Sequence, residues 1–388
     1  MLIPKEEFCE RLVNIRKRMK KDGLDALIVY SNARLPGNVQ YLSDFAPTAA
    51  GYQSIGGFDT VIWGDIIVVV QMEGEPVMLS KCPWIAEGIK DITTLTDIRV
   101  TFDYAKVISE VLPNTEMKIG IDAWGIFPAP VYERLKILLP KATYEGSMIL
   151  EELRMVKSPA ELVLMRKAGK LVVEGIKAGV QAIKPGATEL DVTFAAETAM
   201  RRGNPVYSGY ENQIAGASLV GSGFRTAIGA VTPLPTKKKI KKGELVVMDI
   251  CAEYAGYAGD MSRGKVLGKP SKEQRDFFEA IMQVFEACVK IIKPGTKSRE
   301  IQDTANRVAG ELGYGEYVCR GLATHGIGLE IHERPDSGVE ETVLVPNMVI
   351  SCEPAICTPK FGLRIEDTLR VTDTGHENFT KYEHTLEV

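Results

Sequence analysis

Four carboxylates and one histidine in the C-terminal half of the chain have the types and spacing of a metal site. Asp249 and Asp260 flank one predicted hairpin, Glu353 and Glu366 flank a second, and His325 lies between the two pairs. The surrounding sequence contains no local cluster of lysine or arginine that would compensate these charges. Because closely spaced carboxylates disfavour each other's ionisation, a bound cation would stabilise them. The five residues therefore predict a metal centre.

The first pair of acids lies in a predicted β-hairpin. Residues 245–251 are a β-branched, apolar run typical of a strand, and residues 253–257 contain a glycine that suits a turn. The midpoint of positions 249 and 260 falls inside this turn. If the hairpin is symmetric about its turn, the two aspartates lie directly opposite each other, with Cβ atoms roughly 5 Å apart.

The second pair of acids lies in a similar pattern. Residues 347–352 are a strand candidate, residues 363–366 begin the return strand, and Pro354, Pro359 and Gly362 punctuate the turn. The midpoint of positions 353 and 366 also falls in the turn. A second cross-strand carboxylate pair is therefore predicted.

The composition is that of an ordinary globular protein. The chain has 388 residues, of which 45% are hydrophobic and 25% charged, which is enough for two domains with full cores. The net charge of −4 gives no electrostatic footprint for nucleic acid, and the lysines of residues 237–242 are interpreted as a solvated loop. We expect no nucleic-acid partner.

The sequence predicts a soluble cytoplasmic protein with no membrane partner. Residues 1–21 have an amphipathic, charged helical pattern rather than that of a signal peptide, and no apolar run approaches the roughly 20 residues of a membrane span. Dispersed cysteines suit reduced thiols better than a disulfide framework. The seven are Cys9, Cys82, Cys251, Cys288, Cys319, Cys352 and Cys357.

The pattern of the chain changes near residue 150. Residues 1–150 alternate strand-like runs, such as 26–30 and 66–70, with helical stretches, which predicts a separate α/β domain. Residues 151–388 contain long amphipathic helices. The first of these begins after Ser158, with Glu161 in the position of a capping box.

A short motif occurs twice in the second part. Lys184, Pro185 and Gly186 follow one predicted amphipathic helix and precede another, and the same three residue types recur at 293–295. Each copy is followed at a similar distance by one of the acidic hairpins. This spacing favours a pseudo-twofold domain with helices outside and carboxylate-bearing hairpins inside. The alternative is the coincidence of a short turn motif.

Four segments resemble the metal motifs of the methionine aminopeptidase, prolidase and creatinase superfamily. They are Met248–Asp260, Thr324–Glu333, Cys352–Pro354 and Leu363–Thr368, and their order and spacing agree with the family for all five ligands. The resemblance covers the whole chain. Arg154–Ser158 resembles the entry to the family's catalytic domain, and residues 1–150 resemble the N-terminal domain of the prolidase and creatinase branch.

This resemblance implies an α/β (α+β) protein in which residues 151–388 form a pita-bread catalytic domain with a dinuclear site. It implies manganese, cobalt, iron or zinc, with Asp249 and Asp260 on one metal and His325 and Glu353 on the other. Asp260 and Glu366 would bridge the two. Oxygen-rich ligation suits manganese, and two metals roughly 3.5 Å apart lower the pKa of a bridging water. The resulting hydroxide would attack an amide carbonyl.

Three further residues receive candidate roles. Glu353 is the candidate proton shuttle, and His332 would stabilise the tetrahedral intermediate or contact the substrate carbonyl. Arg364, two residues before Glu366, is interpreted as a structural counter-charge.

The chain departs from its family at one place. Members that hydrolyse peptides commonly have a histidine upstream of the first aspartate, whereas this chain has none before His325. The expected position falls near Ile228–Ala230. Arg225 is a candidate for binding an anionic group of the substrate there, and the alternative is an ordinary surface arginine.

Three hypotheses for function follow. The first is a metallo-exopeptidase of the Xaa-Pro dipeptidase or aminopeptidase type, and the resemblance implies a homodimer. The second is a hydrolase of non-peptide amides or C–N bonds, as in the creatinase branch, which the absent histidine favours. The third is a non-catalytic scaffold, since fold alone does not fix function and some relatives with this fold only bind proteins. Such relatives usually lose ligands, so the intact ligand set argues against this hypothesis.

Overall fold

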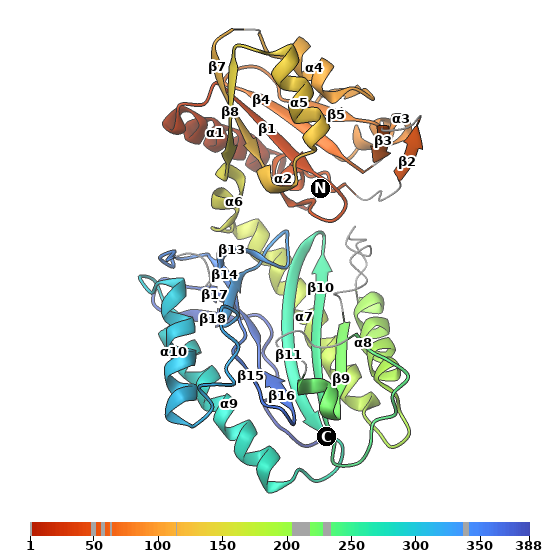
Figure 1. The fold of residues 1–388 in the computed structure, drawn as a ribbon, viewed down its shortest axis with the longest axis vertical. Coiled ribbons are helices and arrows are strands. Elements are labelled where there is room, and N and C mark those ends of the chain that lie inside the picture. Colours follow the sequence, from red (N-terminus) through yellow and green to blue (C-terminus); the bar gives the residue numbers. More distant parts are fainter. Residues whose placement is uncertain are drawn as a thin grey trace. The chain divides into compact units, whose positions relative to one another are not determined.

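The chain forms two compact units in its computed structural model (Figure 1). The structure describes residues 2–47, 52–55, 59–62, 64–113, 115–203, 218–227, 234–336 and 341–388. Of these, the residues up to Arg154 form the first unit, and the residues from Met155 onward form the second.

The first unit is an α/β fold built on a six-stranded sheet with the strand order β6-β5-β4-β1-β7-β8. Strand β1 is antiparallel to β4 and parallel to β7. All six residues of β1 are buried, because its apolar run is covered on both faces. The elements are α1 (Lys5–Asp22), β1 (Ala26–Ser31), α2 (Gly37–Ser43), β2 (Tyr52–Ile55), β3 (Asp59–Ile62), β4 (Ile66–Gln71), β5 (Val77–Ser80), α3 (Pro83–Ile89), β6 (Asp97–Val100), α4 (Tyr104–Val111), β7 (Met117–Asp122), α5 (Ala129–Leu138), β8 (Ala142–Ser147) and α6 (Ile149–Arg154). The predicted N-terminal helix and the strands at 26–30 and 66–70 are confirmed.

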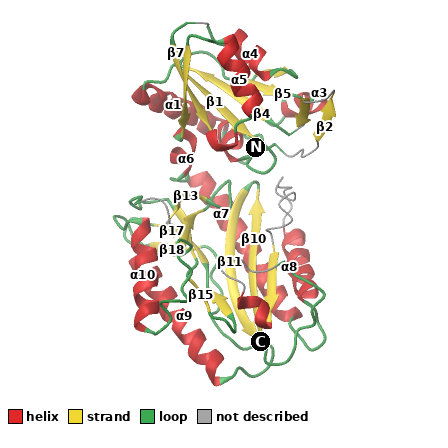
Figure 2. Cartoon of the chain, in the orientation of Figure 1, coloured by secondary structure: helices red, strands yellow, loops and turns green. Residues whose placement is uncertain are grey.

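The described helices of the second unit lie outside its strands (Figure 2). The helices are α7 (Pro159–Ala182), α8 (Glu189–Gly203), α9 (Lys272–Ile291) and α10 (Ser298–Glu311). Helix α7 begins with the predicted capping box, in which Ser158 and Glu161 each bond to the other's backbone N–H. Ser271 and Gln274 form the same arrangement at the start of α9. Both long helices therefore have their first turn fixed by sequence.

The repeated Lys-Pro-Gly motif joins the helices of each pair. Gly186 lies between α7 and α8 with φ of 88°, and Gly295 lies between α9 and α10 with φ of 92°. Glycine adopts this left-handed conformation without the steric cost that other residues incur. The residues that follow also correspond, because Thr188 pairs with Lys239 in one half and Lys297 with Val343 in the other. These equivalent contacts support the predicted pseudo-twofold repeat.

The described strands of the second unit form three sheets. These are β11-β10-β9, β13-β12-β14-β17-β18 and the two-stranded β15-β16. Their bounds are β9 (Ser218–Ser222), β10 (Leu245–Tyr254), β11 (Tyr257–Val266), β12 (Thr324–Gly326), β13 (Glu333–Asp336), β14 (Val349–Cys352), β15 (Ala355–Cys357), β16 (Gly362–Arg364), β17 (Asp367–Val371) and β18 (His376–Asn378).

Alternation along β10 decides which face carries the acids. Val246, Met248 and Ile250 pack into the apolar cluster with residues of α7 and α8, whereas Leu245 and Val247 pack into the cluster with α9. Successive strand residues point to opposite faces. The side chain at position 249 therefore lies on the face opposite α7 and α8, toward the other half of the repeat.

Candidate metal centre

The structure brings all five predicted ligands into one buried cluster in the second unit. Their exposed fractions are 7% for Asp249, 4% for Asp260, 3% for His325, 3% for Glu353 and 0% for Glu366. Four carboxylates this far from solvent are costly without compensating charge.

The two aspartates lie on one face of the β10–β11 hairpin, but they are not directly opposite each other. Asp249 pairs with Ser262, and Asp260 pairs with Cys251. The predicted register was therefore wrong by two residues. Its cause is the turn: Ala255 and Gly256, both at positive φ, form the turn between Tyr254 and Tyr257. The aspartates are consequently diagonal neighbours, a longer separation than that of direct partners.

The two glutamates have the predicted opposition. Cys352 pairs with Asp367 between β14 and β17, and Ala355 pairs with Arg364 between β15 and β16. Glu353 and Glu366 lie between these pairs in the same register, one on each side of the hairpin.

His325 lies on β12, directly opposite Ser351 of β14. Its Nε2 atom is 3.1 Å from Oε1 of Glu353 and 4.0 Å from Oε1 of Glu366. His325 thereby joins the second carboxylate pair to the first, since ligand atoms of Asp260, His325 and Glu366 all lie within 4.8 Å of one another.

Arg364 supplies a positive charge inside the cluster. Its Nη2 atom is 2.9 Å from Oδ2 of Asp249, and its Nη1 atom is 2.5 Å from Oε2 of Glu353. These ion pairs agree with its predicted role as a counter-charge. The β15–β16 hairpin brings this one arginine to the acids.

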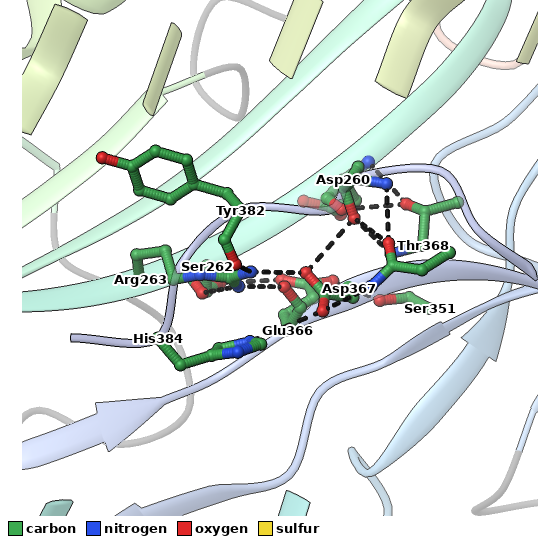
Figure 3. A network of polar contacts seen from close by, with 11 residues as sticks. Asp260, Ser262, Arg263, Ser351, Glu366, Asp367, Thr368, Tyr382 and His384 are labelled. Carbon is green, nitrogen blue, oxygen red and sulfur yellow. Dashed lines mark hydrogen bonds and ion pairs between the residues drawn. The ribbon is translucent and has the colours of Figure 1, made fainter. Parts of the chain in front are cut away.

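Hydroxyl side chains that the sequence analysis did not single out surround the acids (Figure 3). Ser262 Oγ lies 2.8 Å from Asp249 Oδ1 and 2.7 Å from Glu366 Oε2, and Ser351 Oγ donates to Glu366 Oε1. Thr368 Oγ1 accepts from the backbone N–H of Asp260 at 3.0 Å. Each hydroxyl residue lies two positions from a ligand along its segment. Strand alternation could therefore have identified all three.

Burial raises the pKa of two carboxyls in the metal-free cluster. Burial first, and then the charge of Asp249, raise the pKa of Asp260 to about 7. Burial and the charge of Asp260 raise the pKa of Glu366 well above its usual range. A protonated Glu366 also accounts for the Ser262 contacts, because one hydroxyl proton cannot serve two carboxylates.

In the pair of His325 and Glu353, by contrast, the pKa shifts favour the charged form of each group. Burial alone would lower the pKa of His325, but the charge of Glu353 and its hydrogen bond raise that pKa to about 9. Burial alone would raise the pKa of Glu353, but His325 and Arg364 lower it to about 2. Without metal, His325 is therefore a cation at neutral pH and Glu353 a carboxylate.

His332 lies beside His325, in the segment that joins β12 to β13. Their ring centroids are 4.3 Å apart, and a ligand atom of His332 lies within 4.8 Å of those of His325 and Glu353. His332 is exposed to solvent, unlike His325 and Glu353. Desolvation by the surrounding protein and the charge of His325 lower its pKa to about 4, so His332 is neutral at neutral pH.

The cluster has the donors that a divalent cation needs. Oδ1 of Asp260 is buried without a hydrogen-bond partner, although buried polar atoms normally have one. Carboxylate oxygens and an imidazole nitrogen are ligands for manganese, iron, cobalt and zinc. The residues therefore fit a metal site.

Arg225 makes its contacts with residues outside the ligand set. Its Nε atom donates to the buried Glu189 at 3.1 Å, and its Nη2 atom donates to the carbonyl of Leu234 at 2.7 Å. These contacts give Arg225 a structural role, and substrate binding by this residue stays a prediction. The family position near Ile228–Ala230 lies outside the described residues.

A buried ion pair lies next to the ligand Glu366. Arg263 Nη2 is 2.6 Å from Asp367 Oδ1, and both side chains are 1% exposed (Figure 3). Arg263 also donates to the backbone carbonyl of Glu366 at 2.7 Å. The ligand-bearing segment is thus fixed through its backbone.

Comparisons with known proteins agree with this architecture. The model of metallopeptidase family M24 matches residues 163–373, and that of the creatinase/prolidase N-terminal domain matches residues 11–156. The Xaa-Pro dipeptidase of Pyrococcus furiosus is 30% identical over 381 residues, covering 97% of this chain and 99% of the relative. That of Pyrococcus horikoshii is 29% identical over 383 residues, covering 97% and 98%.

Solved structures give the same result for the fold. The crystal structure of the prolidase from Pyrococcus horikoshii has a TM-score of 0.80 at 27% identity, covering 97% of this chain and 99% of that one. The prolidase from Pyrococcus furiosus has a TM-score of 0.79 at 27% identity, covering 95% and 100%.

The fold and the site define a pita-bread metalloenzyme with an N-terminal creatinase-like domain. The chain belongs to metallopeptidase family M24, in its prolidase-like branch, and is a metallo-exopeptidase that uses divalent metal ions. The sequence-based expectation of this family and fold is confirmed.

Proposed function

We propose that the chain is a dinuclear-metal-dependent peptidase of the Xaa-Pro dipeptidase type, with manganese as its metal. The observation that carries the proposal is the buried cluster in which Asp260, His325 and Glu366 converge within 4.8 Å, beside Asp249 and Glu353. The Pyrococcus proteins named as Xaa-Pro dipeptidases align over nearly the whole chain, which supports the substrate class.

The residues divide between holding metal and handling substrate. Asp249, Asp260, His325, Glu353 and Glu366 would hold the two ions, with Asp260 and Glu366 shared between them. Bound divalent ions lower the pKa of water and polarise a carbonyl, which is the chemistry that amide hydrolysis needs.

Two side chains would serve the proton and the substrate. Glu353 is ionised and lies 3.1 Å from His325, so it can accept a proton and return it to the leaving nitrogen. Neutral His332, exposed at the edge of the cluster, can donate a hydrogen bond to the substrate carbonyl as negative charge develops on its oxygen. Arg364 would keep Glu353 and Asp249 in place.

The proposal is tested by metal content and turnover on a peptide panel. Protein freed of metal and reloaded with Mn²⁺ should bind two ions per chain and cleave Xaa-Pro dipeptides faster than Xaa-Xaa dipeptides or tripeptides. An Asp260→Asn variant should lose metal and activity together. Asp276→Asn, on the exposed outer face of α9, should keep both.

Failure of the metal-loaded protein to cleave any peptide of the panel would refute the peptidase assignment. The absence of a histidine before His325 favours one alternative, a hydrolase of non-peptide amides. Turnover of small amides or ureas without turnover of Xaa-Pro peptides would support that alternative, and Asp260→Asn should abolish this activity as well.

We further propose that the chain acts as a cytoplasmic homodimer, as its family resemblance implies. Within the described parts of the chain, no helix has the length and apolar character needed to cross a membrane. Light scattering on the purified protein measures the assembly directly, and a monomeric mass at micromolar concentration would contradict the dimer.

A further inference from the structure

Two cysteines from distant parts of the sequence are in contact beside the metal centre. Sγ of Cys319 lies 3.6 Å from Sγ of Cys357, although 38 residues separate them. Neither forms a disulfide, and both are partly exposed to solvent. A second pair, Cys288 and Cys352, is fully buried, so only the first pair combines contact with access.

Backbone pairing fixes where these two sulfurs lie. Val318 and Ile356 form an antiparallel bridge, with hydrogen bonds from Cys319 N to Ala355 O at 2.9 Å and from Cys357 N to Tyr317 O at 2.8 Å. Cys319 and Cys357 are therefore diagonal neighbours on one face. Regular diagonal positions are roughly 7–8 Å apart, whereas the Cα atoms of a disulfide are usually about 4.4–6.8 Å apart. Closing a disulfide must therefore draw the two segments together.

The two thiols are chemically unequal. The hydrogen bond with Cys357 and then the charge of Arg364 lower the pKa of Cys319. The same hydrogen bond and burial raise the pKa of Cys357. A thiol of lowered pKa beside a second thiol is the arrangement of an attacking and a resolving cysteine.

The pair is connected to the metal ligands through one short hairpin. Ala355, which accepts the hydrogen bond from Cys319, is paired with Arg364 across β15 and β16. Arg364 in turn contacts Glu353 and Asp249. A shift of β15 toward Cys319 therefore acts on the arginine that positions two carboxylates of the cluster.

We propose that Cys319 and Cys357 form a redox-active dithiol, a site for hydroperoxides and small-molecule disulfides, whose closure weakens the adjacent metal centre. With a hydroperoxide, the Cys319 thiolate attacks the peroxide oxygen and becomes a sulfenic acid, and the peroxide is reduced to water or alcohol. Cys357 then attacks the sulfenic sulfur, forming the disulfide and releasing water. With oxidised glutathione, two exchange steps give the same disulfide and two molecules of glutathione. Either route removes two electrons from the protein.

The test uses the full-length protein loaded with Mn²⁺. It is treated with oxidised glutathione or with hydrogen peroxide, remaining thiols are alkylated under denaturing conditions, and peptides are mapped without reduction. We expect a Cys319–Cys357 cross-link, with Cys288, Cys352 and the exposed Cys9 alkylated. The Mn²⁺ dissociation constant, measured with a chromophoric chelator, should rise roughly tenfold, the lower end of the effect of losing an outer-shell partner. Dithiothreitol should reverse it.

Matched variants separate this site from general oxidation. Cys319→Ser and Cys357→Ser should fold normally by circular dichroism and keep their Mn²⁺ affinity after oxidation, whereas Cys9→Ser should respond like the unmodified protein. Absence of the Cys319–Cys357 cross-link overturns the proposal. So does a cross-linked protein whose Mn²⁺ affinity is unchanged. Because the cross-link and the metal affinity are both measured without substrate, neither outcome depends on which peptide the protein cleaves.

Discussion

Replacing Arg263 by methionine should strongly destabilise the second unit. The guanidinium and Asp367 are each 1% exposed and 2.6 Å apart, so the substitution leaves a buried carboxylate without its charge partner. Removing one partner of a buried ion pair costs about 3–5 kcal/mol. Asp367 keeps hydrogen bonds from Asn378 and Thr380 and lies 3.5 Å from His384, so we expect a value near the lower end, about 3 kcal/mol.

The loss of stability can be assigned to one unit of the protein. All three tryptophans, at positions 63, 84 and 124, precede Arg154, so their fluorescence reports on the first unit, whereas far-UV circular dichroism reports on both. At about 2–4 °C per kcal/mol for a domain of this size, the dichroism transition should fall by roughly 6–12 °C. Arg307→Met removes an ion pair that is 60% and 61% exposed and should cost at most about 0.5 kcal/mol.

A second substitution tests whether the uncompensated charge of Asp367 causes the loss of stability. Adding Asp367→Asn to Arg263→Met removes the uncompensated charge and should recover part of the lost stability. If Arg263→Met behaves like Arg307→Met, or if the double variant is no more stable than the single one, the buried pair does not have the stabilising role that we assign to it.

Two further predictions concern the metal-free cluster and its backbone. The folded pKa values of Asp260 and His325, about 7 and 9, exceed their ordinary values, so the folded protein binds more protons than the unfolded chain. Stability of the metal-free protein should therefore fall as pH rises from about 6 to 9, and metal uptake at neutral pH should release protons. Urea unfolding across this pH range measures the stability, and calorimetry in buffers of different ionisation enthalpy measures the proton release. Metal uptake without proton release would contradict the prediction. Separately, Gly326→Ala places a Cβ against the Arg334 carbonyl and should cost about 1–3 kcal/mol and weaken metal binding. Gly310→Ala, with open space around its Cβ, should instead be neutral or stabilising by urea unfolding and should leave metal affinity unchanged.

The sequence identified the members of the buried acidic cluster but not all of their contacts. Asp249, Asp260, His325, Glu353 and Glu366 could be found because acids are informative when they recur around two hairpins. The register of the first hairpin could not, because it depends on which residues of 253–257 adopt positive φ. The structure shows Ala255 in that conformation beside Gly256, and alanine rarely adopts it.

Long-range partners were the other feature that the sequence did not reveal. Cys319 and Cys357 are far apart in the chain, and only the Val318–Ile356 bridge brings them together. The partner of Arg225 was equally hidden, because the buried carboxylate that it contacts, Glu189, lies 36 residues earlier in the chain. Pairings of this kind depend on tertiary contacts that residue types do not encode locally.

The register of the β10–β11 hairpin limits how this enzyme can vary in length. Asp260 faces the cluster because it lies two positions, an even offset, from Ser262, the partner of Asp249. One residue inserted after Gly256, if absorbed by sliding β11 along β10, would turn Asp260 to the face packed against α7. Two residues would keep the face but move the carboxylate by roughly 7 Å along the strand, beyond the reach of His325. Insertions and deletions should therefore be rare at this turn among functional relatives, even though it lies at the end of a hairpin.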